Sequence, residues 1–337
     1  MTPVAILGSG MVTGVGFDAP STCAAIRVGI TGFEETRFMY DGDWLIGCAV
    51  PFEEGWRGRE RLLRMIVPAI QECLAVASHP LLHTPLLLVL AEPGRPGRFD
   101  GLDASFLRDI EERLGTRLHR DSALFAGGHV GGIDAVAHAR QLVGSGATEV
   151  IVAGVDTLLV TGTLTPYVEK RWVQTAENSD GFIAGEAAGA VLLGRPRAGA
   201  TLWCRGLGYG EEPAPIDSGE PLRAQGLVTA IKSALVDAGM EIAQVHYRIS
   251  DIGGGQYWFK EAALALARTL RPVRAEFPLW HPADCIGEVG AAVVPCLLSV
   301  ALAAARKDYA PGPGAICQVG DFGTRRGAMI LHHQEVQ

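Results

Sequence analysis

The chain has 337 residues, of which 48% are hydrophobic and 20% are charged, and its formal net charge is −8. This composition is typical of a globular protein with a large core, and 43 glycines among so many apolar residues predict tight turns rather than disorder. The negative charge argues against a general nucleic-acid-binding protein, because such proteins need a positive field to displace the counterions of the phosphates. The seven cysteines lack metal-ligand spacing, so we expect reduced thiols in a cytoplasmic protein with no metal site and no cofactor.

Short apolar runs alternate with stretches of helical periodicity along the chain. Runs of this length, apolar on both faces, are typical of strands in a central sheet that helices cover on both sides. The chain opens on a strand pattern without a preceding basic region, so we expect no secretory signal peptide. Strands are predicted at residues 4–7, 86–90, 150–154 and 190–193, and helices at 60–77, from about 130 to 143 and from about 287. This alternation predicts an α/β protein.

One apolar stretch, residues 286–305, is long enough to be weighed as a membrane span. It contains Glu288 and Pro295, and most of its other residues are Ala, Gly, Val and Leu. Small residues let a helix pack closely against a sheet. We therefore predict a kinked helix in the protein core and no association with a membrane.

The sequence contains an internal repeat. In the first half, a glycine-rich turn opens a helix near Val130, and "ATEVIVAGVD" and the hairpin-like "DGFIAGEAAGAVLL" follow it. In the second half, a turn opens a helix near Gly287, and "GAICQVGDFGTRRGAMIL" follows it. The segment 194–201, "GRPRAGAT", has the Pro, Gly and Arg of a surface crossing between the halves. We therefore predict two duplicated domains, residues 1–195 and residues 196–337.

Four motifs, in order along the chain, carry a resemblance to one protein family. The first two are "VAILGSGMVTGVG", an opening strand and turn, and "GSGATEVIVAGVD", a strand after a helix. The other two are "SDGFIAGEAAGAVLL", a hairpin, and "VGDFGTRRGAMIL", a glycine loop and closing strand. Together they resemble the β-ketoacyl synthases, the condensing enzymes of the thiolase superfamily. The resemblance implies a thiolase-like fold, with duplicated βαβαβαββ halves in a five-layer αβαβα arrangement and dimerisation through the sheet edge of the first half.

The same resemblance implies a catalytic cysteine at the start of a central helix and two histidines from the second half. In such enzymes a thiolate accepts the acyl chain, and imidazoles assist decarboxylation of the malonyl donor. In this chain the cysteine position falls on His129, the first histidine position on Asp251 and the second on Gly287. The three positions therefore lack the residues on which condensation depends, and we expect no ordinary synthase activity.

His129 nevertheless stands at the expected N-terminus of a helix, whose dipole disfavours an imidazolium by about 0.3–1 kcal/mol. We therefore expect a neutral imidazole at this position. If the halves meet as in the family, Asp251 accepts a hydrogen bond from His129 and orients it, an arrangement suited to acyl chemistry. The alternative is a buried hydrogen bond that fills a former pocket.

Further residues are candidates for the lining of a ligand pocket. Cys285 lies two residues before Gly287, and His281 would replace a lost imidazole if its loop folds inward; inert packing or a structural role is the alternative for both. In the closing glycine loop, Asp321 or Phe322 falls where the resemblance places a mobile phenylalanine over the acyl pocket. A carboxylate at that place would be costly beside a fatty chain.

A group of arginines opens the helix predicted at 60–77: Arg57, Arg59, Arg61 and Arg64. In the family, basic surface near the entrance receives the acidic acyl carrier protein, as complementary potentials predict. Glu60 interrupts the group, so a solvated helix face is the alternative.

Two functional hypotheses follow. The first is a non-catalytic β-ketoacyl synthase-like protein, an accessory or adaptor subunit that forms a homodimer or heterodimer with a thiolase-fold subunit and binds a carrier protein or a secretion effector. Cysteine-lacking thiolase-like proteins occur in type VI secretion clusters beside effector genes, so the resemblance extends to a role in effector loading. The second is a diverged 3-oxoacyl carrier protein synthase, acyltransferase or thioesterase that uses His129 and Asp251 on acyl-CoA or an acyl carrier protein.

Overall fold

Two sets of five strands organise the computed structural model, which describes residues 2–196, 201–270, 274 and 276–333. In the first set, β1 (Val4–Thr13) is followed across the sheet by β7 (Ala184–Gly194), β6 (Glu149–Thr157), β4 (Leu86–Val89) and β5 (Ala123–Phe125). In the second, β8 (Leu202–Glu211) is followed by β12 (Arg325–His333), β11 (Gly314–Gly320), β9 (Tyr247–Ser250) and β10 (Leu279–Trp280). Antiparallel pairing between β1 and β8 joins the two sets.

The two halves repeat the same strand order and the same strand directions. Numbered within its own half, each set of strands has the order 3-2-4-5-1. In both halves the second strand pairs in parallel with the third and fourth, and the fifth pairs antiparallel with the fourth and first. The predicted duplication and the α/β class are therefore confirmed. The boundary expected at residues 195 and 196 falls between β7 and β8, directly before residues 197–200, which lie outside the described residues.

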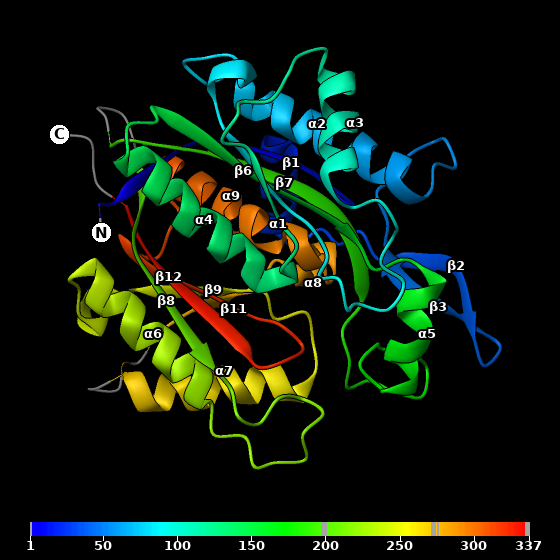
Figure 1. Ribbon diagram of the computed structural model, residues 1–337. Coiled ribbons are helices and arrows are strands. Elements are labelled where there is room, and N and C mark those ends of the chain that lie inside the picture. Colours follow the sequence, from blue (N-terminus) through cyan, green and yellow to red (C-terminus); the bar gives the residue numbers. More distant parts are fainter. Residues whose placement is uncertain (1, 197–200, 271–273, 275, 334–337) are drawn as a thin grey trace.

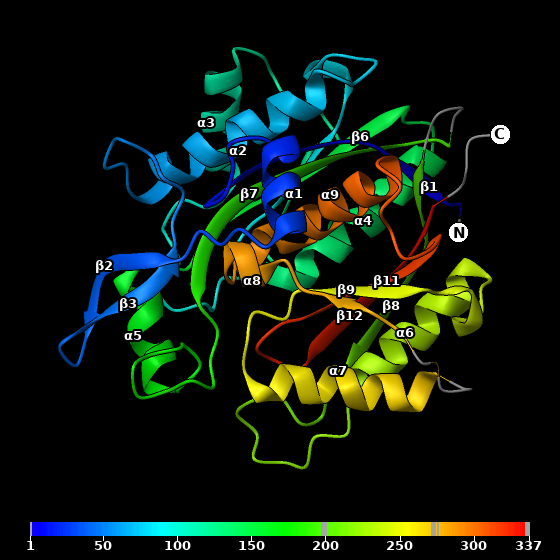
Figure 2. The same cartoon turned by 180° about the vertical axis from the view of Figure 1, so that it is seen from behind.

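Helices form three layers around these strands, as Figures 1 and 2 show. The central layer lies between the two sets of strands, the first and the second sheet, and contains α4 (Gly128–Gly144) and α9 (Val293–Arg306), with α1 (Ala19–Val28) packed against α9. The first sheet is covered on its outer face by α2 (Gly58–Leu74) and α3 (Ala104–Leu114), and the second by α6 (Gln225–Ala238) and α7 (Gln256–Thr269). This is the αβαβα arrangement that the resemblance implied.

Glycines bring the central helices close to each other and to the first sheet. A Cβ at Gly132 of α4 would collide with Val294 of α9, and a Cβ at Gly189 of β7 would lie 2.9 Å from the sulfur of Cys296. Both positions are buried among apolar side chains from both halves. These two glycines therefore allow close packing in the central layer, whereas others, such as Gly29 and Gly42, have positive φ in turns.

The apolar stretch 286–305 is not one kinked helix. The short helix α8 (Ala283–Ile286) ends at its start, and a 3-10 turn, η3 (Gly290–Ala292), precedes α9. Pro295 lies in the first turn of α9, where backbone N–H groups have no partner within the helix, so no kink is needed there. The prediction of a core helix is confirmed and that of a continuous kinked one is wrong. Within the described ranges, no helix has the length and apolar character needed to span a membrane.

The first half also carries a hairpin, made of β2 (Glu34–Tyr40) and β3 (Asp43–Cys48), that projects from the body of the molecule (Figure 1). It joins the main sheet where the end of β3 pairs with the start of β7. The remaining elements are α5 (Thr161–Glu169) and two 3-10 turns, η1 (Leu81–His83) and η2 (Ile242–Gln244).

Candidate functional site

The N-terminus of α4 carries the histidine that the motif comparison singled out. Only residues 126 and 127 separate β5 from α4, and Gly128, at the first position of the helix, has a φ of +55°. A Cβ at Gly128 would collide with the carboxylate of Glu92, so this sharp turn requires glycine. The next residue, His129, has a side chain that is 7% exposed. The local sequence therefore places a buried imidazole at the start of the central helix.

Glu288 is the hydrogen-bond partner of His129. Their Nε2 and Oε1 atoms are 2.7 Å apart, and the same Oε1 accepts a hydrogen bond of 2.9 Å from the backbone N–H of Gly290. Backbone hydrogen bonds to residues 183 and 185 fix the main chain of Glu288 against the start of β7. Glu288 lies between α8 and η3, outside either helical turn, and this position lets its carboxylate reach His129 of α4.

The charge of Glu288 favours the protonated form of His129, so the contact between them is an ion pair in that form. Burial by itself would lower the pKa of His129, but the charge and hydrogen bond of Glu288, with smaller effects of Asp251 and Glu92, raise it to about 10. Burial also opposes ionisation of Glu288, yet His129 and the N–H of Gly290 hold its pKa below the usual value. The expectation of a neutral imidazole is therefore wrong, because nearby carboxylates outweigh the helix dipole. An imidazolium has protons on both nitrogens and no lone pair for attack.

Asp251, the expected partner of His129, is engaged elsewhere. It follows β9, its Oδ2 accepts a hydrogen bond of 2.8 Å from the backbone N–H of Gly320, and its Oδ1 lies 3.2 Å from the hydroxyl of Ser250. Burial raises the pKa of Asp251 to about 6, although the charge of His129 opposes the rise. The predicted hydrogen bond between His129 and Asp251 is therefore replaced by the bond to Glu288.

The motif comparison placed the second histidine position on Gly287, but the residue that contacts His129 is the next one, Glu288. Gly287 has a φ of +72°, and a Cβ there would lie 2.9 Å from the carbonyl oxygen of Ile183, so its role is to let the chain turn. Glu288, which follows it, is the site residue that sequence reasoning missed. A signal was present in the sequence, because a carboxylate inside an apolar stretch is costly to bury unless a partner meets it.

Phe322 packs on the imidazole of the ion pair. Its ring centroid lies 5.7 Å from that of His129, in an edge-on arrangement, and it stacks on Trp172 at 4.9 Å with an interplanar angle of 8°. Three more rings surround it, those of Tyr167, Phe182 and Trp258. Of the two candidates in this loop, Phe322 reaches the site, whereas the Asp321 carboxylate accepts a hydrogen bond from the backbone N–H of Arg325.

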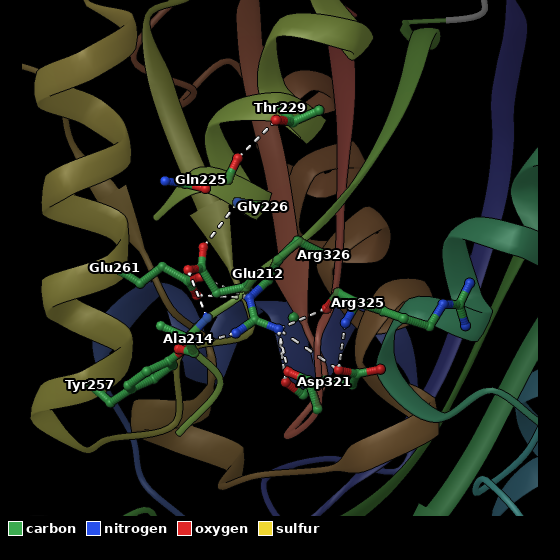
Figure 3. A network of polar contacts seen from close by, with 12 residues as sticks. Glu212, Ala214, Gln225, Gly226, Thr229, Tyr257, Glu261, Asp321, Arg325 and Arg326 are labelled. Carbon is green, nitrogen blue, oxygen red and sulfur yellow. Dashed lines mark hydrogen bonds and ion pairs between the residues drawn. The ribbon is translucent and has the colours of Figure 1, made fainter. Parts of the chain in front are cut away.

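The loop that carries Phe322 is held by Arg326, as Figure 3 shows. The side chain of Arg326 is 1% exposed, its Nε donates to both carboxylate oxygens of Glu261 at 2.8 and 2.9 Å, and its Nη1 donates to backbone carbonyls of residues 321, 323 and 325. Its Nη2 also donates to the hydroxyl of Tyr257. Burial raises the pKa of Glu261 to about 7, and Arg326 works against that rise. This network fixes Phe322 in place.

A hollow of about 280 Å³ lies beside the aromatic cluster. Its lining includes Phe322, Trp172 and Trp258, with Lys170 placed 4.3 Å from the centroid of the Trp172 ring. The space next to Asp251 is only about 10 Å³, which is room for about one water molecule. Because Phe322 both lines the hollow and packs on His129, it stands between that hollow and the ion pair.

Cys285 and His281 line a different cavity, with a volume of about 480 Å³. Cys285 is 5% exposed, and burial, followed by the charge of Asp284, raises the pKa of its thiol. The Nδ1 of His281 lies 2.9 Å from Oδ1 of Asp284. A thiol of raised pKa is a poor nucleophile, so sharing a cavity with a histidine does not make Cys285 reactive. Of the candidate pocket residues, Cys285 and His281 thus line one space, Phe322 lines another, and Asp321 lines neither.

The arginines at the start of α2 do not form one free basic surface. Arg61 is paired with the buried carboxylate of Glu186, and Arg59 and Arg64 are paired with acidic residues of α3 and α2. Arg57 and Arg64 are the exposed members. Arg61 therefore has a structural contact, and the basic surface is smaller than the sequence suggests.

This arrangement offers little for covalent or metal chemistry. The imidazolium of His129 can donate hydrogen bonds but cannot attack a thioester. All seven cysteines are buried, and the N-terminus of α4 carries none of them. Within the described ranges, no group of three or more His, Cys, Asp and Glu side chains is placed to hold a metal ion.

Two curated proteins share part of this sequence, and no protein-family model matches it. The chain is 29% identical over 210 residues to the granaticin polyketide β-ketoacyl synthase 2 of Streptomyces violaceoruber. It is 29% identical over 213 residues to the actinorhodin polyketide β-ketoacyl synthase 2 of Streptomyces coelicolor. Each match covers 57% of this chain and 49% or 51% of the relative. The chain therefore spans about half the length of the curated relatives it matches.

Solved structures share the fold over nearly the whole chain. A type II polyketide synthase acyl carrier protein in complex with its ketosynthase matches with a TM-score of 0.82 at 13% identity, over 98% of this chain and 99% of that chain. The ishigamide ketosynthase/chain length factor matches with a TM-score of 0.73 at 17% identity, over 99% and 100%. A ketosynthase in complex with its chain length factor, from Xenorhabdus doucetiae, matches with a TM-score of 0.74 at 13% identity, over 99% and 98%. The predicted thiolase-like fold is confirmed.

Proposed function

From these similarities we propose that the chain is a β-ketoacyl synthase-like member of the thiolase superfamily and a non-catalytic subunit, retained for the partner it binds. The observation that carries the proposal is the buried ion pair between His129 and Glu288 at the N-terminus of α4. By the family pattern, an active synthase holds its thiolate at this place. A paired imidazolium cannot accept an acyl group there.

The charges around His129 also oppose condensation. The donor substrate of a condensing enzyme develops negative charge on an oxygen as carbon dioxide leaves, and catalysis requires donors aimed at that oxygen. Here the carboxylates of Glu288, Asp251 and Glu92 all raise the pKa of His129, so each places negative charge within reach of the site. An enolate in this position would be repelled rather than stabilised.

The partner surface that we propose is the free edge of the first sheet. Among the described strands, β5 is terminal and pairs with β4 alone, and its three residues are half-buried. An edge strand presents unpaired N–H and C=O groups that another chain can pair with. Two of the similar structures are by name a ketosynthase together with a chain length factor, which supports an unlike thiolase-fold subunit as the partner and leaves a homodimer as the alternative.

A carrier protein is the second partner in this proposal, and a secretion effector is the alternative cargo. The exposed Arg57 and Arg64 suit an acidic carrier protein, and one similar structure contains a carrier protein with its ketosynthase. Reversing both charges, by Arg57→Glu and Arg64→Glu, should weaken binding of an acidic carrier protein. A pull-down in which the double variant still captures a type VI effector would instead favour the role in effector loading.

The alternative proposal is a diverged acyltransferase or thioesterase that uses His129 and Asp251. It would require His129 to lose its proton and Phe322 to move aside. Intact-mass measurement after incubation with acyl-CoA and with an acyl carrier protein decides between the two. We expect no mass increase, whereas an acyl adduct that His129→Ala abolishes would overturn the non-catalytic proposal.

Co-expression with a ketosynthase from the same organism tests the binding role. We expect a stoichiometric complex that His129→Ala retains, with slower amide hydrogen exchange at residues 123–125 in the complex than in the isolated chain. A complex that forms without protecting residues 123–125 would overturn the assignment of the β5 edge. Failure of every thiolase-fold protein of that organism to associate with the chain would overturn the partner role itself.

A further inference from the structure

A second cavity lies beside α8, with Pro282, Asp284 and Cys285 among its lining residues. The C-terminal end of α1, strand β10 and α8 enclose its volume of about 480 Å³, and Figure 2 shows α1 and α8 on one face of the molecule. Small-molecule sites in proteins usually have volumes of about 300–1,000 Å³. The cavity therefore has the size of a ligand site, and the chemistry of its walls decides which ligand it suits.

Two aromatic side chains form walls of this cavity. The ring centroids of Trp280 and Tyr309 are 6.2 Å apart with an interplanar angle of 32°. The buried Tyr247 supports Trp280 from a centroid distance of 4.7 Å. Ile26 and Val300 contribute apolar surface between these walls. A flat ring packs well on such walls because aromatic pairs prefer offset or tilted contacts.

One positive charge in the cavity has no acidic partner among the described residues. The guanidinium carbon of Arg27 lies 4.2 Å from the centroid of the Tyr309 ring, and Arg27 forms no ion pair with another described residue. A guanidinium stacked on a ring keeps the N–H donors at its edge free. Of the other polar groups that line the cavity, Asp284 is acidic, and the Nδ1 of His281 lies 2.9 Å from its Oδ1 without forming a hydrogen bond. Arg27 is therefore the group available to an anion.

We propose that this cavity binds a planar aromatic carboxylate, with its ring against Trp280 and Tyr309 and its carboxylate on the edge of Arg27. A single guanidinium offers two parallel N–H donors, which match the two oxygens of a carboxylate. Asp284, whose side chain is 68% exposed, also lines the cavity, and its negative charge disfavours a doubly charged phosphate more than a singly charged carboxylate. The proposal uses no residue of the His129 site and stands apart from the proposed function.

Titration of the protein with 2-naphthoate tests the proposal, with binding detected by saturation-transfer NMR and by tryptophan fluorescence. We expect saturation transfer to naphthoate at millimolar concentration, and binding about tenfold weaker for 2-naphthylmethanol, which lacks the charge, and for cyclohexanecarboxylate, which lacks the ring. Arg27→Gln should weaken naphthoate about tenfold and leave 2-naphthylmethanol unchanged. The matched control is Arg37→Gln, an exposed arginine stacked on Phe38 at 5.1 Å that lies on the hairpin, and it should change neither affinity.

Several results would overturn the proposal. They are an absence of saturation transfer to naphthoate, equal affinity for naphthoate and 2-naphthylmethanol, and an Arg27→Gln variant that binds naphthoate as the wild type does. Thermal melting shows whether each variant is folded, and Arg27, at the exposed end of α1, should tolerate the change. Tyr309→Leu removes one wall and keeps the guanidinium, so it must weaken naphthoate and 2-naphthylmethanol alike; no loss for either ligand would also overturn the assignment.

Discussion

Replacing Glu288 with glutamine removes the charge that keeps His129 protonated and preserves the shape of the side chain. The pKa of His129 rises from its ordinary value of 6.5 to about 10 in the folded protein. Both side chains of the pair are only 7% exposed, so water does little to replace the interaction that the substitution removes. Removing one partner of a buried ion pair costs about 3–5 kcal/mol in other proteins. We therefore expect Glu288→Gln to lower the free energy of unfolding at pH 7 by about 3–5 kcal/mol.

Urea unfolding followed by circular dichroism measures this loss. The matched control is Glu177→Gln, an exposed carboxylate whose replacement should change the free energy of unfolding by less than about 0.5 kcal/mol. The double variant His129→Leu, Glu288→Leu should recover most of the stability, because it removes both buried charges. A folded Glu288→Gln variant that loses less than about 1 kcal/mol would refute the assignment of a buried ion pair.

Three further predictions concern the same site. The pKa of His129 is higher in the folded protein than in the unfolded chain, so protonation of His129 stabilises the fold. This stabilisation is complete below about pH 6.5 and is lost as the pH rises toward 10. Urea unfolding at several pH values should show the decline, and the Glu288→Gln variant should show a flatter dependence on pH. Phe322→Ala should lower the free energy of unfolding by about 2 kcal/mol and shift the fluorescence of Trp172 to longer wavelength, and an unchanged spectrum would contradict the stacking. Arg326→Met should lower the free energy of unfolding by about 3–5 kcal/mol because it leaves the buried Glu261 without its partner. It should also speed proteolysis within residues 320–325, and cleavage at the wild-type rate would contradict the conclusion that Arg326 holds this loop.

The layers of the fold follow from apolar runs that the sequence displays openly. The runs at 86–90 and 150–154 appear as β4 (Leu86–Val89) and β6 (Glu149–Thr157), and the helix expected at 60–77 appears as α2 (Gly58–Leu74). The strands β5 and β10 have three and two residues, too few to show a periodicity, so their pairing depends on the neighbouring strand. Most residues of the β2–β3 hairpin are exposed, so it lacks the apolar alternation that marks a half-buried strand.

The site was predictable in its position and not in its partners. The motifs place His129 at the start of the central helix because strand, turn and helix are local features. The partner Glu288 is 159 residues away along the chain. Gly287 marks the turn after Ile286, but no local pattern shows that this turn directs the carboxylate of Glu288 toward His129. Arg61 likewise pairs with the carboxylate of Glu186, 125 residues away along the chain, so an arginine that the sequence suggests is part of a basic surface has a structural role. Contacts of this kind depend on how the elements pack.

The charge of His129 is the physical claim on which this account depends, and nitrogen NMR of the imidazole rings measures it directly. Labelling the nine histidines with ¹⁵N and subtracting the spectrum of His129→Gln identifies the signals of this ring. The account predicts that both ring nitrogens remain protonated at pH 8, where unperturbed histidines are neutral, and that the midpoint lies near pH 10. A neutral ring at pH 7, with one protonated and one free nitrogen, would contradict it and would restore a lone pair for acyl chemistry.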